Sequence, residues 1–228
     1  VFSVCNSNTK FMKHYNNNSY TMLPTYEIKS KNNNEKSIVN NQTKKNNILY
    51  TGNLSWRANM EGLKWFVKKV FPLIKDIIQD VKLTIIGSGP ATNPFIGMND
   101  IDYKGYIKDI SNIYLEHKVF IVPLFEGSGI RIKILEAFNN ELAVVSTTLG
   151  CESINAKNKK ELFIADNEKE FSDYVIKLLI DDTCNIEMVS CAKKFLQQNF
   201  SLDSHQKEFE RIVQEYLSKK SKSNASSC

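Results

Sequence analysis

The amino-acid sequence predicts a doubly wound α/β fold, in which helices cover both faces of a parallel sheet. Short apolar runs of strand length alternate along the chain with longer stretches that have the 3.6-residue periodicity of helices. Glycine or another small residue follows most of the apolar runs. Because parallel neighbours in a sheet are joined by crossover helices, this order of elements predicts a parallel sheet rather than an antiparallel one.

The composition fits a globular protein of one domain or slightly more, with 228 residues of which 42% are hydrophobic. The formal net charge is +5, but the basic residues are dispersed and form no basic-aromatic stripe, so we expect no nucleic-acid partner. No apolar run reaches the ~18 residues of a membrane-spanning helix. We therefore expect no spanning helix. The cysteine usage described next favours a cytoplasmic protein, and peripheral contact with the inner face of a membrane stays open.

The five cysteines are odd in number and form no Cys-x-x-Cys pair, which favours reduced thiols and predicts no metal site. The first residues lack the basic and long apolar regions of a signal peptide. Because the chain starts with Val1 and not with methionine, we expect a fragment or a processed product.

Composition divides the chain into five parts. Residues 29–46 are almost entirely polar, with Lys and Asn most frequent, which predicts a flexible linker. The expected parts are a tail of another domain or a small appendage at 1–28, this linker at 29–46, the main domain at 47–200, a C-terminal helix at 201–220 and a disordered tail at 221–228.

The apolar pattern predicts each element of these parts in order. Strands are expected at Val1–Val4, Tyr20–Leu23, Ile48–Thr51, Val81–Ile86, Ile101–Lys104, Lys118–Leu124, Leu142–Ser146 and Glu161–Ala165. Helices are expected at Asn8–Tyr15, Asn59–Ile78, Asp109–Glu116, from Ile130, and at Asn167–Asp181, Asn185–Gln198 and Leu202–Lys219. Pro72 should kink the helix that contains it, Asp109 should cap its helix, and a loop is expected at Thr147–Ile154.

The stretch Pro123–Phe138 carries the clearest sign of a ligand. Gly127 and Gly129 permit a sharp turn directly before a helix, whose first N–H groups and dipole attract anions. Arg131 and Lys133 fall in the expected first turn, where the dipole disfavours each cation by ~0.3–1 kcal/mol. An anionic ligand explains these charges, whereas the alternative is a solvated face.

Glu136 follows Lys133 by three residues and lies on neighbouring helix surface. A carboxylate just beyond a phosphate site suits the hydroxyls of a sugar, because it accepts hydrogen bonds in pairs. The alternative is a single Lys133–Glu136 surface pair. The glycines at the other strand ends likewise have an alternative interpretation, as ordinary residues of tight turns.

Five stretches occur in the order and spacing of one family: Tyr50–Asn59, Leu83–Gly89, Gly105–Asp109, Pro123–Phe138 and Val144–Glu152. Together they resemble the C-terminal, donor-binding half of family 4 glycosyltransferases of the GT-B class (glycosyl transferases group 1). The resemblance implies a Rossmann-like domain over about residues 47–217. It also implies that residues 1–28 are a remnant of the N-terminal, acceptor-binding domain.

The resemblance implies a role for each matching residue. Glu136 holds ribose hydroxyls, Gly129, Ile130 and Arg131 receive the diphosphate, and the backbone of Ile107 meets the base. Two positions depart from the family, since Ser128 replaces the first Glu of its motif and Ala58, beside Arg57, replaces its Lys. The predicted substrate-binding residues are Gly52, Asn53, Arg57, Ile107, Gly127, Ser128, Gly129, Ile130, Arg131, Lys133 and Glu136.

The implied activity is retaining transfer of a sugar from a nucleotide-diphosphate sugar, such as a UDP- or GDP-sugar, in glycan or polysaccharide synthesis. The acceptor would be a glycan or a lipid-linked sugar, held by an N-terminal domain or a partner chain. No cofactor or metal is implied, and the catalytic residues stay unknown beyond electrostatic support from Arg131 and Lys133.

Two other functions fit the sequence. One is a non-catalytic nucleotide-sugar-binding module or subunit that needs a separate acceptor-domain chain. The other is a plain nucleotide- or phosphate-binding protein with no transfer reaction. The histidines, His14, His117 and His205, match no family motif, and we expect them at the surface or at helix ends.

Overall fold

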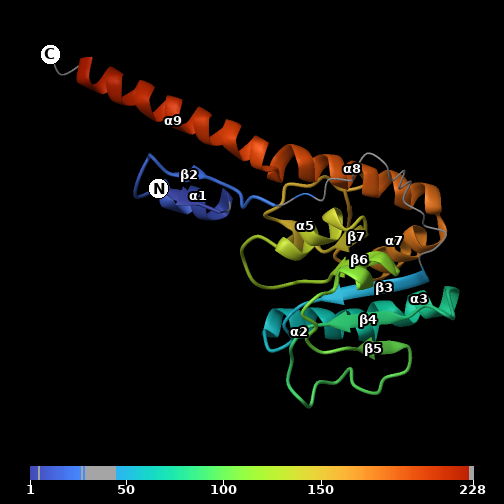
Figure 1. Ribbon diagram of the computed structural model, residues 1–228. Coiled ribbons are helices and arrows are strands. Elements are labelled where there is room, and N and C mark those ends of the chain that lie inside the picture. The colour runs from blue at the N-terminus through green and yellow to red at the C-terminus, as the bar shows by residue number, and fades with distance from the viewer. Residues whose placement is uncertain (5, 27, 29–44, 226–228) are drawn as a thin grey trace. The chain divides into compact units, whose positions relative to one another are not determined.

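The structure, a computed structural model, describes residues 1–4, 6–26, 28 and 45–225 (Figure 1). These residues form two compact units. One unit contains the described residues up to Ile28 together with the chain from Leu196, and the other contains the chain from Lys45 to Phe195. The two units are described separately.

The larger unit is built on a parallel sheet. Among its described residues the strands are β3 (Lys45–Thr51), β4 (Leu83–Ile86), β5 (Ile101–Tyr103), β6 (His117–Val122), β7 (Ala143–Ser146) and β8 (Phe163–Ile164). They lie in the order β5-β4-β3-β6-β7-β8, and every pair of neighbours is parallel. The predicted doubly wound fold is thus confirmed. The order reverses between β3 and β6, which makes this point the topological switch point.

Helices connect these strands or follow the last of them. They are α2 (Arg57–Trp65), the π-helical segment η2 (Phe66–Val70), α3 (Phe71–Ile77), α4 (Ser111–Leu115), α5 (Ile132–Asn139), α6 (Thr148–Cys151), α7 (Glu168–Ile180) and α8 (Asp182–Phe200). A kink is expected at Pro72, and the structure has the π-helical segment η2 in the turn directly before this proline. Proline lacks the N–H group of a regular turn and its ring crowds the carbonyl four residues earlier, and the wider π-helical turn accommodates both effects.

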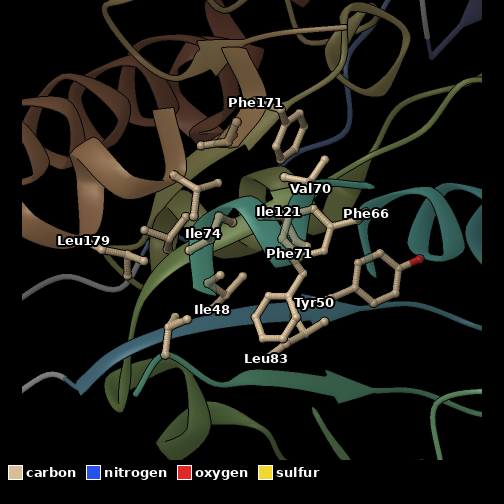
Figure 2. Packing of buried hydrophobic residues seen from close by; sticks show 14 of the residues in the cluster. Ile48, Tyr50, Phe66, Val70, Phe71, Ile74, Leu83, Ile121, Phe171 and Leu179 are labelled. Atoms are coloured by element: carbon tan, nitrogen blue, oxygen red, sulfur yellow. The ribbon is translucent and has the colours of Figure 1, made fainter. Parts of the chain in front are cut away.

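The core of this unit lies between the sheet and the helices η2, α3 and α7 (Figure 2). Ile48 and Tyr50 of β3 are fully buried, as are Phe66 of η2 and Phe171 of α7. The rings of Phe66 and Phe171 meet edge to face, with centroids 5.8 Å apart. Large apolar side chains on successive helical turns therefore fix η2 and α7 against the strands that carry the site.

Three local predictions differ from the structure. Asp109 lies before α4 and accepts a hydrogen bond from the Ser111 N–H at 2.9 Å, so that the helix begins two residues later than expected. The expected loop after β7 contains α6, because the Thr147 side chain accepts from the Gly150 N–H and caps one helical turn. His117 is buried, with its ring nitrogens 2.6 Å from the Ile113 carbonyl oxygen and 2.8 Å from Thr84 Oγ1.

The smaller unit contains β1 (Phe2–Ser3), α1 (Asn6–Met12), β2 (Tyr20–Thr21) and α9 (Leu202–Ala225). The strands β1 and β2 are parallel neighbours. The ring of Phe2 lies 6.3 Å from that of Phe209 on α9. Residues from the start of the chain and from the C-terminal helix thus pack in one unit, while the interpretation of residues 1–28 as a domain remnant stays a prediction.

Two boundaries differ from those expected from composition. β3 begins at Lys45, inside the predicted linker, and the rest of that linker (29–44) lies outside the described residues. α9 continues to Ala225, into the predicted disordered tail, since no glycine or proline interrupts the sequence up to that residue. Within the described part of the chain, no helix combines the length and apolarity that crossing a bilayer requires.

Candidate functional site

The turns at the carboxyl ends of β3, β4 and β5 are joined by backbone hydrogen bonds. The N–H of Gly52 donates to the carbonyl of Ile86 at 2.9 Å, and the N–H of Gly87 donates to the carbonyl of Gly105 at 2.8 Å. The predicted site residues Gly52 and Asn53 therefore lie at an edge of the sheet that these hydrogen bonds hold together, next to the switch point. A ligand at this edge meets fixed backbone groups.

The turn after β6 lies on the other side of the switch point. Gly127 and Gly129 have φ angles of +96° and +93°, in the region that favours glycine. Arg131 has non-helical angles and is the N-cap of α5, which begins at Ile132. The expected helix start near Ile130 is corrected by two residues, so that only Lys133 of the two cations lies in the first turn.

Lys133 reaches from α5 across to β3 and α2. Its Nζ lies 4.7 Å from the centroid of the Tyr50 ring and donates to Asn59 Oδ1 at 3.3 Å. A Cβ atom on Gly52 would lie only 2.8 Å from this Nζ. The ammonium therefore rests against the backbone at the end of β3, and a side chain at position 52 would have to displace it.

The charge of Lys133 is strongly affected by this environment. Burial of the ammonium, reinforced by the nearby Arg131, lowers the pKa of Lys133 from 10.5 to about 8, and Glu136 opposes the shift. Among the described residues, Lys133 makes no ion pair with a carboxylate. Its direct contacts among the described residues are a neutral amide and an aromatic ring, and a buried cation in such contacts provides a place for an anion at the switch point.

The guanidinium of Arg131 does not extend freely into solvent but is bonded to the turn that precedes it. Its Nη1 donates to the carbonyl of Ser128 at 2.9 Å, and its Nη2 lies 3.1 Å from the place of a Cβ on Gly127. Its Nε is buried and has no partner. Burial lowers the pKa of Arg131, and Glu152 opposes this shift. The guanidinium therefore folds over the turn that contains Gly127 and Ser128.

Arg57 and Glu136, the two remaining charged residues of the prediction, both have partners. Arg57 at the start of α2 forms an ion pair with Glu126 at 2.5 Å, in the loop after β6, which leaves less of its charge for a ligand. The hydroxyl of the buried Tyr114 lies 3.4 Å from Glu136 Oε2 and donates to it. The Glu136 carboxylate thus has a hydrogen-bond partner on its own unit before any ligand binds.

The structure brings together most of the predicted residues but not all of them. Ile107 lies in the loop after β5, and no hydrogen bond or ion pair of the described residues joins it to the others. Within the described ranges, no three His, Cys, Asp or Glu side chains form a group that could hold a metal ion. Cys151, Cys184 and Cys191 are free thiols, while Cys5 and Cys228 lie outside the described residues.

Sequence reasoning missed the residues that hold the charged groups, namely Tyr50, Asn59 and Tyr114. Tyr50 follows the apolar pattern of β3, and Asn59 is 74 positions away from Lys133. The only signal for Asn59 was its place at the end of the stretch Tyr50–Asn59. A sequence pattern does not show which side chains from different elements contact each other in the fold.

The sequence is similar to that of a known enzyme family. A profile described as "Glycosyl transferases group 1" matches residues 45–181, more than half of the chain. The chain belongs to this family of group 1 glycosyltransferases. A 44.6 kDa protein of Klebsiella pneumoniae, named as an uncharacterized protein in the cps region, is 30% identical over 171 residues. These residues are 68% of this chain and 42% of that protein, so this chain spans about two fifths of the length of its relative.

Solved GT-B glycosyltransferases have the same fold. TarM of S. aureus has a TM-score of 0.73 at 14% identity, over 93% of this chain and 43% of TarM. HepE of Anabaena has a TM-score of 0.68 at 12% identity, over 94% of this chain and 63% of its own. A glycosyltransferase of Rickettsia africae also reaches 0.68, at 18% identity, over 95% and 63%. At these identities the likeness establishes the Rossmann-like fold alone.

Proposed function

We propose that this chain is the donor-binding half of a retaining glycosyltransferase that uses a nucleotide-diphosphate sugar. The observation that carries the proposal is the buried ammonium of Lys133 at the switch point, without a carboxylate partner among the described residues. Lys133 lies in the first turn of α5, where the helix has free N–H groups. A diphosphate carries the charge that both features attract.

In this proposal the residues of the site have separate tasks. Lys133 and the first N–H groups of α5 stabilise the charge that develops on the leaving diphosphate, which is electrostatic catalysis. Glu136, oriented by Tyr114, accepts hydrogen bonds from ribose hydroxyls. Arg131 keeps the turn at Gly127 and Ser128 in shape and thus places the diphosphate.

UDP is the first nucleotide to test. TarM was solved with UDP, HepE with UDP and glucose, and the pneumococcal O-GlcNAc transferase GtfA with UDP and GlcNAc. WaaG, a further fold neighbour, is a glycosyltransferase involved in lipopolysaccharide biosynthesis. We propose by analogy that the acceptor is a glycan or a lipid-linked sugar.

We further propose that the acceptor is held by an N-terminal domain or a partner chain, and that this chain alone has little turnover. The smaller unit supports this, because two-stranded sheets such as that of β1 and β2 are rarely stable without further strands. It also exposes large apolar side chains, including Phe2, Phe11, Tyr15 and Phe209.

Calorimetric titration of this chain with UDP, GDP and ADP, with phosphate as the control, tests the donor site. We expect micromolar to sub-millimolar binding of one nucleotide and none of phosphate alone. If a folded chain binds none of the three nucleotides, the proposed donor site is wrong.

Glu136→Ala should weaken the binding of that nucleotide by about 1–3 kcal/mol, the usual loss when a charged hydrogen-bond partner is removed. Calorimetry measures this change. Glu187→Ala, on the exposed surface of α8, is the matched control and should leave the affinity unchanged. An unchanged affinity of Glu136→Ala would remove this carboxylate from the site.

The affinity for the nucleoside diphosphate should fall as the pH rises through about 8, because Lys133 then loses its proton. The groups that face it are the phenol of Tyr50 from β3, the amide of Asn59 from α2, and Arg131 and Glu136 around α5. Burial raises the pKa of Tyr50, so this phenol stays neutral in the range. We expect about a tenfold loss between roughly pH 7.5 and 9.5 in titrations, and a constant affinity would contradict the role of Lys133.

A further inference from the structure

The side chain of Asn59 lies between the two turns that flank the switch point. Its Nδ2 donates to the carbonyl of Asn53 at 2.9 Å, in the turn after β3. Its Oδ1 accepts from Lys133 Nζ on α5 at 3.3 Å. Its backbone carbonyl accepts from the Tyr50 hydroxyl at 3.5 Å. One residue of α2 thus links the end of β3 to the first turn of α5.

The chemistry of these partners selects an amide at position 59. A backbone carbonyl can only accept a hydrogen bond and an ammonium can only donate one, so the group between them must do both. An aspartate at this place would accept from Lys133 but would repel the carbonyl of Asn53. A leucine of similar size would satisfy neither partner and would leave the buried ammonium without a hydrogen bond from this side.

The space around the ammonium is also restricted. A Cβ on Gly52 would lie 2.8 Å from Lys133 Nζ and 3.2 Å from Asn59 Nδ2. The Tyr50 ring lies on another side of the ammonium, at 4.7 Å. Tyr50, Gly52 and Asn59 therefore determine the position of the ammonium, and none of these three contributes a negative charge.

We propose that Asn59 is a positioning residue, which holds the ammonium of Lys133 at the switch point without neutralising its charge. The inference rests on the proposed function, in which this ammonium meets a diphosphate. Arg57 shows the other possibility in the same site, because the carboxylate of Glu126 forms an ion pair with it. A carboxylate at position 59 would hold Lys133 as well, but it would also compete with the anionic ligand.

A double-mutant cycle tests this role. The affinity for UDP, or for whichever of UDP, GDP and ADP binds, is measured by calorimetry for the unmodified chain, Asn59→Ala, Lys133→Met and the double variant. Asn59→Ala should weaken binding about 3- to 10-fold, but less than about 2-fold when Lys133 is already methionine, because its effect passes through the ammonium. Asn99→Ala, in the exposed turn before β5, is the control and should bind like the unmodified chain.

Asn59→Asp gives a readout that a merely structural role would not change. The new carboxylate should weaken UDP binding more than Asn59→Ala does and should move the pH at which affinity is lost upward from about 8, because it stabilises the protonated Lys133. Thermal melting of every variant identifies losses that come from unfolding. If Asn59→Ala does not fold, the nearly isosteric Asn59→Asp still decides the question through its pH profile.

The outcomes separate the two proposals. If the folded, unmodified chain binds none of the three nucleotides, the proposed function is wrong and the positioning role has no ligand to act on, so it is wrong as well. If the chain binds one nucleotide but Asn59→Ala weakens it equally with and without Lys133, the positioning role alone is overturned. An Asn59→Asp variant that keeps the pH profile of the unmodified chain would also overturn it.

Discussion

Replacing Lys133 by methionine should weaken the affinity for a nucleoside diphosphate by about 30- to 150-fold and should at the same time stabilise the ligand-free chain. The loss corresponds to roughly 2–3 kcal/mol, the range of a hydrogen bond between charged groups in a site shielded from water. Methionine has nearly the length of the lysine stem and no charge. The substitution therefore removes the cation while it keeps much of the contact with Tyr50.

The gain in stability follows from the pKa of Lys133, which is about 8 in the folded chain and 10.5 as the reference for the unfolded chain. A folded pKa below the unfolded one means that the unfolded state binds more protons between these two values. Burial of the charge therefore costs folding free energy below about pH 8, and the cost disappears as the pH rises toward 10.5. Because the side chain as a whole is only half-buried, we expect methionine to recover about 1–2 kcal/mol at pH 7.

Thermal melting at pH 7 and calorimetry measure the two effects on one preparation. We expect the melting temperature of Lys133→Met to rise by about 2–8 °C, and the rise to shrink at pH 10. Lys69→Met, at an exposed position of η2, is the matched control for exchanging lysine for methionine. A lower melting temperature for Lys133→Met would show that its contacts with Tyr50 and Asn59 outweigh the cost of the buried charge.

The fold could be predicted from the sequence because its main elements have simple periodic patterns. The run at Lys118–Leu124 overlaps β6 (His117–Val122) from its second residue to its end, and the apolar positions after Asn59 lie on the continuous helical segment α2–η2–α3. The boundaries were less accurate where local hydrogen bonds decide them. Thr147 caps a short helix that the apolar pattern does not show, and Asp109 bonds to Ser111 before α4 begins.

The site was predictable only in part, for a physical reason. The glycines and cations of the turn before α5 are close together in the sequence, so their common location follows from local structure. The partners of the cations come from other elements. The sequence does not show that Glu126 forms an ion pair with Arg57 or that Asn59 accepts a hydrogen bond from Lys133. These contacts depend on how α2 packs against the turn after β6 and against α5.

Gly62 is a position at which a single methyl group should severely damage this arrangement. It lies in α2, and a Cβ there would be 1.8 Å from the carbonyl oxygen of Pro123 and 3.5 Å from Cα of Leu124. These are backbone atoms of the segment that leads from β6 to the turn with Gly127. Because backbone cannot turn away as a side chain does, Gly62→Ala must push α2 and this segment apart.

We expect Gly62→Ala to destabilise the chain by about 2–4 kcal/mol, the effect of severe overpacking, and to lower its melting temperature by roughly 5–15 °C. The sign is informative, since alanine in place of glycine inside a helix ordinarily stabilises by about 0.5–1 kcal/mol. Lys68→Ala, at an exposed position of η2, is the control and should change stability by less than about 0.5 kcal/mol. An unchanged or higher melting temperature for Gly62→Ala would mean that α2 does not approach the Pro123–Leu124 backbone this closely. The reach of Lys133 to Asn59 depends on the same approach, so a Gly62→Ala chain that folds with α2 displaced should also bind the nucleotide more weakly.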